Sequence, residues 1–306
     1  MSPNLANTRP PTIDLPAALR WERGAPPHTP WLHEEVARRM EDRLQWIRLQ
    51  PRCWVHWDAV RGGMQAHGLL ARRYPQADCF VVQPQPAGTV AHKEARALVP
   101  PALSLARWSG GRTRLAEPAE GTAQMLWANM ALHMAADPQG LIARWHRALA
   151  VDGFVMFSAL GPDTLSELRP IYQAMGWPPP AHEFTDMHDW GDMLVQAGFA
   201  EPVMDMERIV LTWDSPQRLL GELRALGANL HRGRFAALRG RRWKAALEHA
   251  LAEGLARADE HGRLALTFEV VYGHALKAAP RLRVSEQSTV SLQDMRAMLR
   301  SDRGTS

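Results

Sequence analysis

Apolar residues recur along the chain with two spacings, and the alternation of these spacings predicts an α/β fold. Helical spacing is clear over Glu34–Leu49, which has acidic residues in its first turn and a proline soon after its end. Short β-like runs follow, separated by further helical stretches, at Cys53–Trp57, Asp78–Val82, Gln124–Ala131 and Gly153–Ala159. Such alternation indicates a parallel sheet that is covered by helices on both faces.

The second half of the chain adds two longer strands with a helical segment between them. We expect Asp186 to cap a helix that runs through Ala197, followed by a strand within Val203–Thr212. A second apolar strand spans Leu264–Ala275. Residues 215–262 between these strands carry helical spacing with cap and first-turn signals at the start, which predicts a helical insertion at the ligand end of the sheet.

The two ends of the chain have a different character from the middle. Residues 1–30 contain seven prolines and few periodic apolar positions, which predicts a loose N-terminal arm. Residues 279–306 are largely polar and are expected to form a tail. The structured domain is therefore expected over residues 31–278, and the 46% of apolar residues in the chain are enough for a sizeable core.

Charge and cysteine content narrow the class of protein. The formal net charge of +4 is modest, so the placement of charge matters more than its total. Cys53 and Cys79 each lie at the start of a buried-strand pattern, which indicates core thiols rather than a disulfide. Neither a signal peptide nor an apolar run of about 18 residues is present, so we expect a cytoplasmic protein with no membrane partner.

Five blocks of sequence carry a resemblance to a known family. They are WANMAL at Trp127–Leu132, FVMFSALGPDTLSELR at Phe154–Arg169, FTDMHDWGDMLVQAGFAEPVMDMERIVLTW at Phe184–Trp213, LLGELRALGAN at Leu219–Asn229 and LTFEVVYGHA at Leu266–Ala275. In this order they resemble the malonyl-acyl-carrier-protein O-methyltransferase family of biotin synthesis. The resemblance implies a class I S-adenosylmethionine-dependent methyltransferase fold, with a seven-stranded Rossmann-like sheet whose last strand runs antiparallel.

The resemblance also implies an activity. Members of the family methylate the free carboxylate of malonyl-carrier protein, which disguises it as a fatty-acid primer. S-adenosylmethionine is then the expected cofactor and malonyl-loaded acyl-carrier protein the expected partner. Because in-line methyl transfer depends on positioning and desolvation of the carboxylate, no nucleophilic residue is required and we assign no catalytic residue.

The expected cofactor loop, WVHWDAVRGGM at Trp54–Met64, departs from the family pattern. A backbone that comes close to a nucleotide-type ligand normally has glycine at two or three set positions. Aligned on the Gly63–Met64 pair, the family's first acidic residue falls at His56, and its glycines fall at Asp58, Val60 and Gly62. Only Gly62 and Gly63 are therefore available to provide backbone clearance.

Other expected cofactor contacts are altered as well. The acid that grips the ribose hydroxyls corresponds to Gln83, which accepts a hydrogen bond without charge, and the acid near the adenine amine corresponds to Arg112, which only donates. Asn129 either shapes the cofactor and substrate mouth or forms a local turn. Losing two charge-assisted hydrogen bonds weakens binding by roughly a hundred- to ten-thousand-fold.

Because some family motifs are retained and others are altered, three hypotheses about the function follow. The first is a methyltransferase of this family with weakened or lost cofactor binding. The second is a noncatalytic pseudoenzyme or scaffold that binds acyl-carrier protein. The third is an altered chemistry in the same pocket, because one fold can host several reactions and Arg112 suits an anion.

A basic cluster offers a docking surface for a partner. Six cations lie between residues 231 and 244, namely Arg232, Arg234, Arg239, Arg241, Arg242 and Lys244. Carrier proteins are acidic, so the resemblance implies that this cluster docks the carrier, with a solvated helix face as the alternative. We expect no nucleic-acid partner and no metal, because no nucleic-acid-binding motif or metal-ligand spacing occurs, and we expect a monomer.

Overall fold

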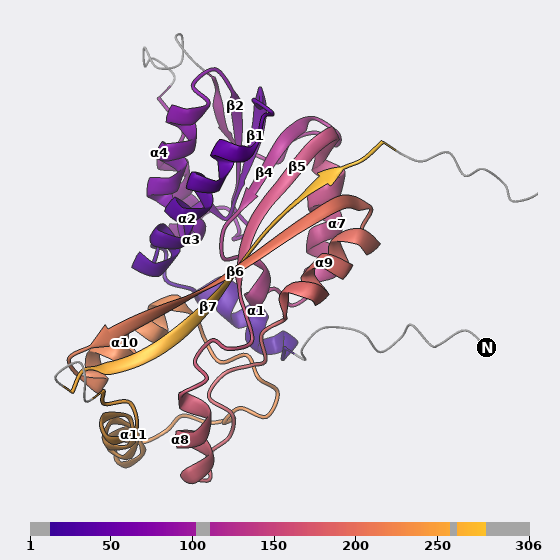
Figure 1. Cartoon of the computed structure of the whole chain (residues 1–306). Helices are drawn as coiled ribbons and strands as arrows, with labels where there is room; N and C mark the ends of the chain where they lie inside the picture. The colour runs from indigo at the N-terminus through magenta and orange to yellow at the C-terminus, as the bar shows by residue number, and fades with distance from the viewer. Residues whose placement is uncertain (1–12, 102–110, 258–261, 280–306) are drawn as a thin grey trace, which may run out of the picture.

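The computed structural model describes residues 13–101, 111–257 and 262–279, and these residues form a seven-stranded sheet in the order β3-β2-β1-β4-β5-β7-β6 (Figure 1). The strands are β1 (Cys53–Trp57), β2 (Asp78–Val82), β3 (Thr113–Leu115), β4 (Ala123–Ala128), β5 (Leu149–Leu160), β6 (Phe199–Trp213) and β7 (Leu264–Lys277). Pairings among β1 to β5 are parallel, whereas β7 runs antiparallel to β5 and β6. The expected α/β class with an antiparallel last strand is confirmed.

Helices cover both faces of the sheet because successive strand residues point in opposite directions. Trp54 and Trp127 face α2 (Trp31–Arg43) and α4 (Met64–Arg73), with which they share one apolar cluster. Val55 and its neighbours on the other side pack against α7 (Pro138–Ala148) and α9 (Met187–Gln196). Short helices α3 (Ala59–Gly62), α5 (Val90–Ala97) and α8 (Leu168–Ala174) and the turns η2 (Leu44–Trp46) and η3 (Leu132–Met134) complete the connections.

Helix ends follow the local sequence signals in part. The Asp186 carboxylate accepts hydrogen bonds from the backbone N–H groups of His188 and Asp189, so the expected cap of α9 is confirmed. The helix expected over Glu34–Leu49 begins three residues earlier, at Trp31, and gives way to the turn η2 after Arg43.

The N-terminal segment differs from the expected loose arm. Residues 1–12 lie outside the described residues, but Leu15–Gly24 form the helix α1, in which Pro16 occupies the first turn, where a missing N–H costs nothing. Ala17 and Ala18 are buried against Leu230, whose carbonyl accepts a hydrogen bond from the Asp14 N–H at 2.8 Å. This long-range contact, which the local proline content does not reveal, orders the segment.

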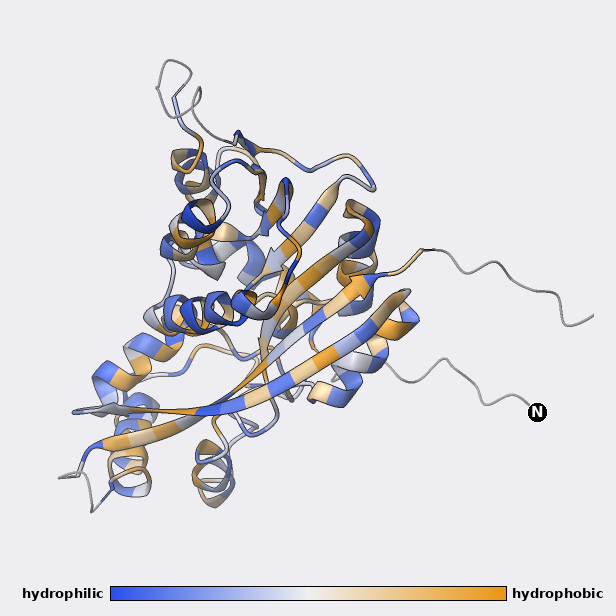
Figure 2. Cartoon of the chain, turned by 45° about the horizontal axis from the view of Figure 1, so that its top comes forward, coloured by the Kyte–Doolittle hydropathy of each residue, from blue (hydrophilic) through white to orange (hydrophobic). Residues whose placement is uncertain are grey.

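The helical segment between β6 and β7 is confirmed in the described residues. It contains α10 (Pro216–Leu226) and α11 (Arg241–Gly254), which lie near α8 beneath the far ends of the two long strands (Figure 1). Along β6 apolar residues are interspersed with polar ones (Figure 2). Among the described helices, none is long and apolar enough to cross a membrane. The expected tail from residue 280 onward lies outside the described residues.

Candidate functional site

A cleft of about 250 Å³ opens where three strands end. Asp58 follows β1, Gln85 lies in the segment after β2, and Met130 and Ala131 follow β4. Trp21 of α1 lines the same cleft from the N-terminal segment. The carboxyl ends of parallel strands are the usual ligand edge of such sheets, so the cleft is the candidate cofactor site.

The loop after β1 holds the two retained glycines in close packing. Gly63 has φ +135°, and a Cβ added there would lie 2.9 Å from the Ala66 Cβ. A Cβ at Gly62 would lie 3.1 Å from the Asn129 backbone oxygen. Asp58 adopts the left-handed conformation, with φ 49°, which favours glycine but is tolerated by aspartate. These glycines therefore serve close contacts within the protein.

Gln83 connects the loops after β1 and β2. Its Nε2 donates to Asp58 Oδ1 at 2.7 Å and to Gln85 Oε1, while its own Oε1 is buried with no partner among the described residues. Burial raises the pKa of the Asp58 carboxyl, and the nearby Arg61 charge and the Gln83 amide oppose this rise. The Gln83 oxygen is thus a buried acceptor without a partner, but Gln83 is not among the residues that line the cleft, whereas its partners Asp58 and Gln85 are.

Asn129 holds the loop after β1 through buried hydrogen bonds and does not line the cleft. Its buried Nδ2 donates to the carbonyls of Gly62 and His33, the latter at 2.8 Å. Its Oδ1 accepts from Ser158 Oγ at 2.6 Å, and the same hydroxyl accepts from the Met130 N–H at 3.0 Å. Of the two interpretations of Asn129, this geometry favours satisfaction of the backbone.

Arg112 is not brought to the other candidate cofactor residues. It lies at the amino end of β3, where its N–H donates to Asp78 Oδ1 and its carbonyl accepts from the Cys79 N–H, both at 2.8 Å. The assignment of Arg112 to the adenine is corrected because a parallel strand presents its opposite, carboxyl end to the cleft. Glu117 stands beyond that end and pairs with Arg144, which lines the cleft.

Arg61 is a site residue that sequence reasoning missed. Its side chain is only 8% exposed, and its Nη2 donates to the Leu226 and Ala225 carbonyls at 2.9 and 3.2 Å. Its Nη1 donates to the Pro26 carbonyl at 3.3 Å, and its guanidinium lies 4.8 Å from the Trp21 ring centroid. The available signal was an arginine between Val60 and Gly62, inside a loop that is glycine-rich in the family.

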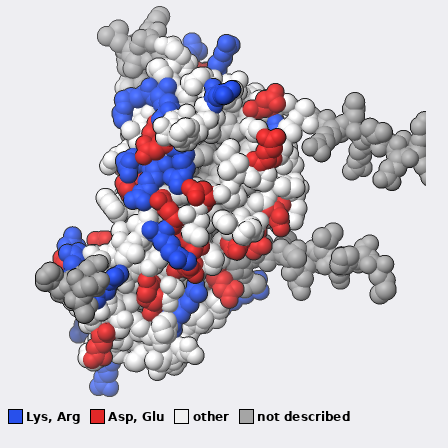
Figure 3. Space-filling view, viewed as in Figure 1, with Lys and Arg blue, Asp and Glu red and all other residues white. Residues whose placement is uncertain are grey.

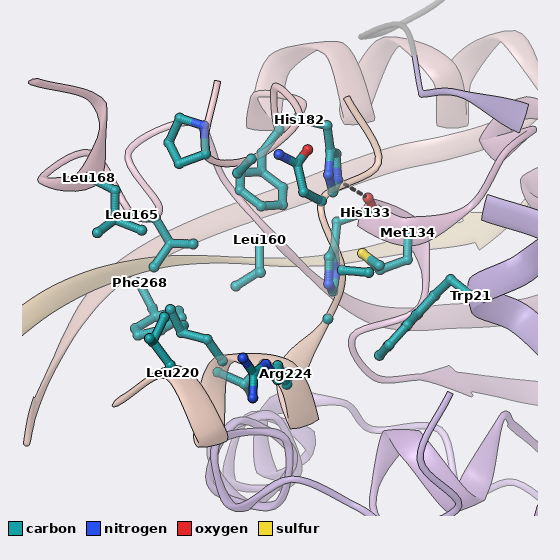
Figure 4. A pocket seen from close by; sticks show the side chains of 18 of the residues that line it. Trp21, His133, Met134, Leu160, Leu165, Leu168, His182, Leu220, Arg224 and Phe268 are labelled. Atoms are coloured by element: carbon teal, nitrogen blue, oxygen red, sulfur yellow. Dashed lines mark hydrogen bonds between the residues drawn. The ribbon is translucent and has the colours of Figure 1, made fainter. Parts of the chain in front are cut away.

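A second cavity of about 510 Å³, here called the apolar chamber, adjoins the cleft. Figure 4 shows Leu160, Leu168 and Phe268 directed into it, with Leu220 and Arg224 of α10 below. The chamber shares three lining residues with the cleft, namely Trp21, Met134 and Leu226. The cleft and the chamber therefore have a common wall.

Two buried histidines provide polar groups in the wall of the apolar chamber. His182 Nε2 lies 2.9 Å from the His133 carbonyl oxygen, which accepts only, so Nε2 carries the proton (Figure 4). The Nδ1 atoms of His133 and His182 have no partner among the described residues. Burial is the largest cause that lowers the pKa of both imidazoles, which favours their neutral forms.

The six candidate docking cations divide into two groups. Arg234 forms an ion pair with Asp14, and the Arg239 guanidinium lies 4.1 and 3.8 Å from the ring centroids of Phe235 and Trp243. The side chains of the other four are exposed, and they are Arg232, Arg241, Arg242 and Lys244. The last three lie in the first turn of α11, which contains no acidic residue. Thus four of the six are exposed to a partner, and of these Lys244 also forms an ion pair with Glu248 at 3.5 Å.

Another basic area lies over α2 in Figure 3. There Arg38, Arg39 and Arg43 form ion pairs with Glu35, Asp42, Glu207 and Asp205. These local pairs reduce the pull of this area on an acidic partner. Across the described residues, no group of three or more His, Cys, Asp or Glu side chains has an arrangement that fits a metal ion.

Comparison with known proteins defines the class and then the family. The fold is similar to that of a Bacillus halodurans structure titled as a methyltransferase, with a TM-score of 0.51, 12% identity and coverage of 78% of this chain and 99% of that chain. The YcgJ protein of Bacillus subtilis gives a TM-score of 0.50 at 12% identity, covering 80% of this chain and 99% of that one. The fold is therefore that of a class I methyltransferase.

Curated relatives identify the family. The malonyl-[acyl-carrier protein] O-methyltransferase of Laribacter hongkongensis is 39% identical over 275 residues, which cover 87% of this chain and 88% of the relative. The protein of the same name from Gallionella capsiferriformans is 38% identical, covering 82% and 86%. No family model matches the chain. The chain belongs to the malonyl-[acyl-carrier protein] O-methyltransferase family.

Proposed function

We propose that this chain is an S-adenosylmethionine-dependent methyltransferase that esterifies the free carboxylate of malonyl-loaded acyl-carrier protein in biotin synthesis, with weaker cofactor binding than glycine-loop members of the family. The observation that carries this proposal is the common wall between the cleft and the apolar chamber at the carboxyl edge of the sheet. A methyl donor in one cavity and an acyl group in the other would meet at that wall.

The residues of the cleft fit the cofactor in part. Asp58 and Gln85 line the cleft and offer side-chain acceptors to the cofactor, and both accept a hydrogen bond from Gln83, which corresponds to the family's ribose-binding acid. The bound cofactor would supply the methyl group. The cleft volume of about 250 Å³ is below the roughly 300–1,000 Å³ of typical small-molecule sites. Because the Asp58 side chain replaces a family glycine and the Arg61 side chain also lines the cleft, we expect reduced affinity rather than an unaltered site.

The acceptor side favours methyl transfer to a carboxylate. Leucines and phenylalanines of the apolar chamber exclude water, and removing water from a carboxylate makes it more reactive in a bimolecular displacement. The neutral His182 Nδ1 would accept a hydrogen bond from an amide of a carrier-borne arm. The exposed cations of α11 would attract the acidic carrier and increase its rate of encounter.

A noncatalytic carrier-binding scaffold is the second candidate. It is favoured by one observation, that Arg61 projects from the loop after β1 and is held there by three backbone carbonyls. If this arrangement excludes the cofactor, the chamber and the cations would still bind a carrier. In either case we propose a cytoplasmic, monomeric protein.

Methyl transfer to two carrier proteins tests the proposal. The full chain is incubated with saturating methyl-labelled S-adenosylmethionine and either malonyl- or acetyl-loaded acyl-carrier protein, and the intact carriers are analysed by mass spectrometry. We expect an ester on the malonyl form and none on the acetyl form, which lacks a free carboxylate. Carrier binding without any ester would instead support the scaffold.

A further inference from the structure

Arg61 is a buried cation at the junction of the two cavities. It lines the cleft, its guanidinium contacts the Trp21 ring, and it donates to the Leu226 carbonyl. Trp21 and Leu226 are two of the three residues that line both cavities. The guanidinium is thus placed beside the common wall, where the methyl donor and the acyl group would approach each other.

The charge of Arg61 is incompletely compensated. Its hydrogen bonds use three of the five guanidinium N–H donors, all for neutral backbone carbonyls, which leaves Nε and one Nη1 hydrogen. No carboxylate oxygen of the described residues lies within 4.0 Å of it, although Asp58 is close enough to interact with it electrostatically. Buried charges are normally paired, so this one has capacity for an anion.

The groups around the guanidinium restrict what that anion is. His33 donates through its Nδ1–H to the Arg61 carbonyl at 2.8 Å, and burial lowers the pKa of this imidazole to about 3, so it adds no positive charge. His133 is also neutral because burial lowers its pKa. With a single cation and the Asp58 carboxyl nearby, a monoanion is better matched than a phosphate with two negative charges.

We infer that the Arg61 guanidinium binds a ligand carboxylate at the junction of the cleft and the apolar chamber. This inference rests on the proposed function and specifies what its site recognises. Two ligands of the proposed reaction carry such a group, namely the malonyl unit and the amino-acid portion of the cofactor. An arginine in a poorly solvated wall would distinguish either one from an analogue that lacks the carboxylate.

Calorimetric binding of two ligand pairs to the full chain tests the inference without turnover. The acyl pair is malonyl-pantetheine and acetyl-pantetheine, and the cofactor pair is S-adenosylhomocysteine and 5′-methylthioadenosine, which lacks the amino-acid portion. In the wild-type protein the carboxylate member of at least one pair should bind about ten- to a hundred-fold more tightly, as expected for one charge-assisted hydrogen bond. The pair that shows this preference identifies the source of the carboxylate.

Substitution of Arg61 then assigns the preference to this residue. In Arg61→Met the preference should fall to about onefold for that pair, whereas Arg61→Lys, which keeps the charge, should retain part of it. Arg73→Met is the matched control, because it removes a half-buried arginine that pairs with Glu41 and lines neither cavity. This control should leave both ratios unchanged.

The outcomes separate the inference from the proposed function. A wild-type protein that binds both members of each pair equally, or binds no carboxylate ligand at millimolar concentration, would overturn the inference even if Arg61→Met does not fold. An unchanged preference in a folded Arg61→Met variant would overturn it as well. Failure of methyl transfer with the malonyl preference intact would refute the proposed activity and leave the carboxylate site standing.

Discussion

Replacement of Asn129 by alanine would show how far the loop after β1 depends on one buried amide. The change removes two hydrogen bonds to the His33 and Gly62 carbonyls and one from the Ser158 hydroxyl. Each buried polar group left without a partner costs about 1–3 kcal/mol. Since the Ser158 hydroxyl keeps its hydrogen bond from the Met130 N–H, the two carbonyls account for most of the loss, and we expect the free energy of unfolding to fall by about 3–5 kcal/mol. That is a large share of the roughly 5–15 kcal/mol typical of a folded domain.

Urea unfolding at 25 °C would measure this loss, with thermal unfolding as a second probe. A loss of about 3–5 kcal/mol should lower the midpoint by about 10 °C in a protein of this size. Ser158→Ala alone should cost less, because the amide keeps both backbone partners. The double variant should lose less than the sum of the two single effects, since the residues share a bond. A loss below about 1 kcal/mol in Asn129→Ala would refute the bracing role.

Three other predictions concern the loop, the buried histidines and the docking surface. Gly63→Ala should destabilise the protein by about 2 kcal/mol in urea unfolding, which is more than the loss expected for Gly121→Ala. Both glycines have positive φ, but of the two only Gly63 has other atoms within 4 Å of an added Cβ. Equal losses would contradict the packing argument. Burial lowers the pKa of His67 from 6.5 to about 4, so the unfolded state takes up a proton at a higher pH than the folded state, and the free energy of unfolding falls as the pH drops below 6.5. Between about pH 7.5 and 5.5, the free energy of unfolding should fall by about 1.4 kcal/mol more in the wild type than in His67→Leu. Identical losses would be inconsistent with a neutral buried ring. Arg241→Glu combined with Arg242→Glu should reduce the association rate with acyl-carrier protein at least tenfold at low salt. The variant should remain folded, because acidic residues at the start of α11 stabilise that helix. An unchanged association rate in surface plasmon resonance would exclude docking at this surface.

Sequence reasoning succeeded where the signal is local. Strands β1 and β2 have the predicted limits, because consecutive β-branched and aromatic residues indicate a short buried strand. The capping role of Asp186 was also predictable, since a cap needs only the residue and the helix that follows it. Family motifs added the antiparallel direction of β7, which no local pattern gives.

The errors occurred where distant segments decide the structure. Helix α1 depends on Leu230, more than two hundred residues away in sequence, so its prolines gave a misleading picture of the N-terminal segment. Arg112 was aligned to the cofactor through a segment whose strand limits were unknown, and β3 begins after it. The role of Arg61 could not be predicted from its own loop, because its hydrogen-bond partners lie in α10 and in the segment before α2.

Titration of the full chain with S-adenosylhomocysteine in a calorimeter is the most direct test of the central claim, that the cleft still binds the cofactor despite its altered loop. We predict saturable binding at one site, with a dissociation constant in the range of roughly tens to hundreds of micromolar. We also predict a rise in the midpoint of thermal unfolding, because a ligand concentration one hundred times the dissociation constant adds about 2.7 kcal/mol to the free energy of unfolding. Absence of heat and of any midpoint shift at millimolar ligand would contradict the claim and favour the carrier-binding scaffold.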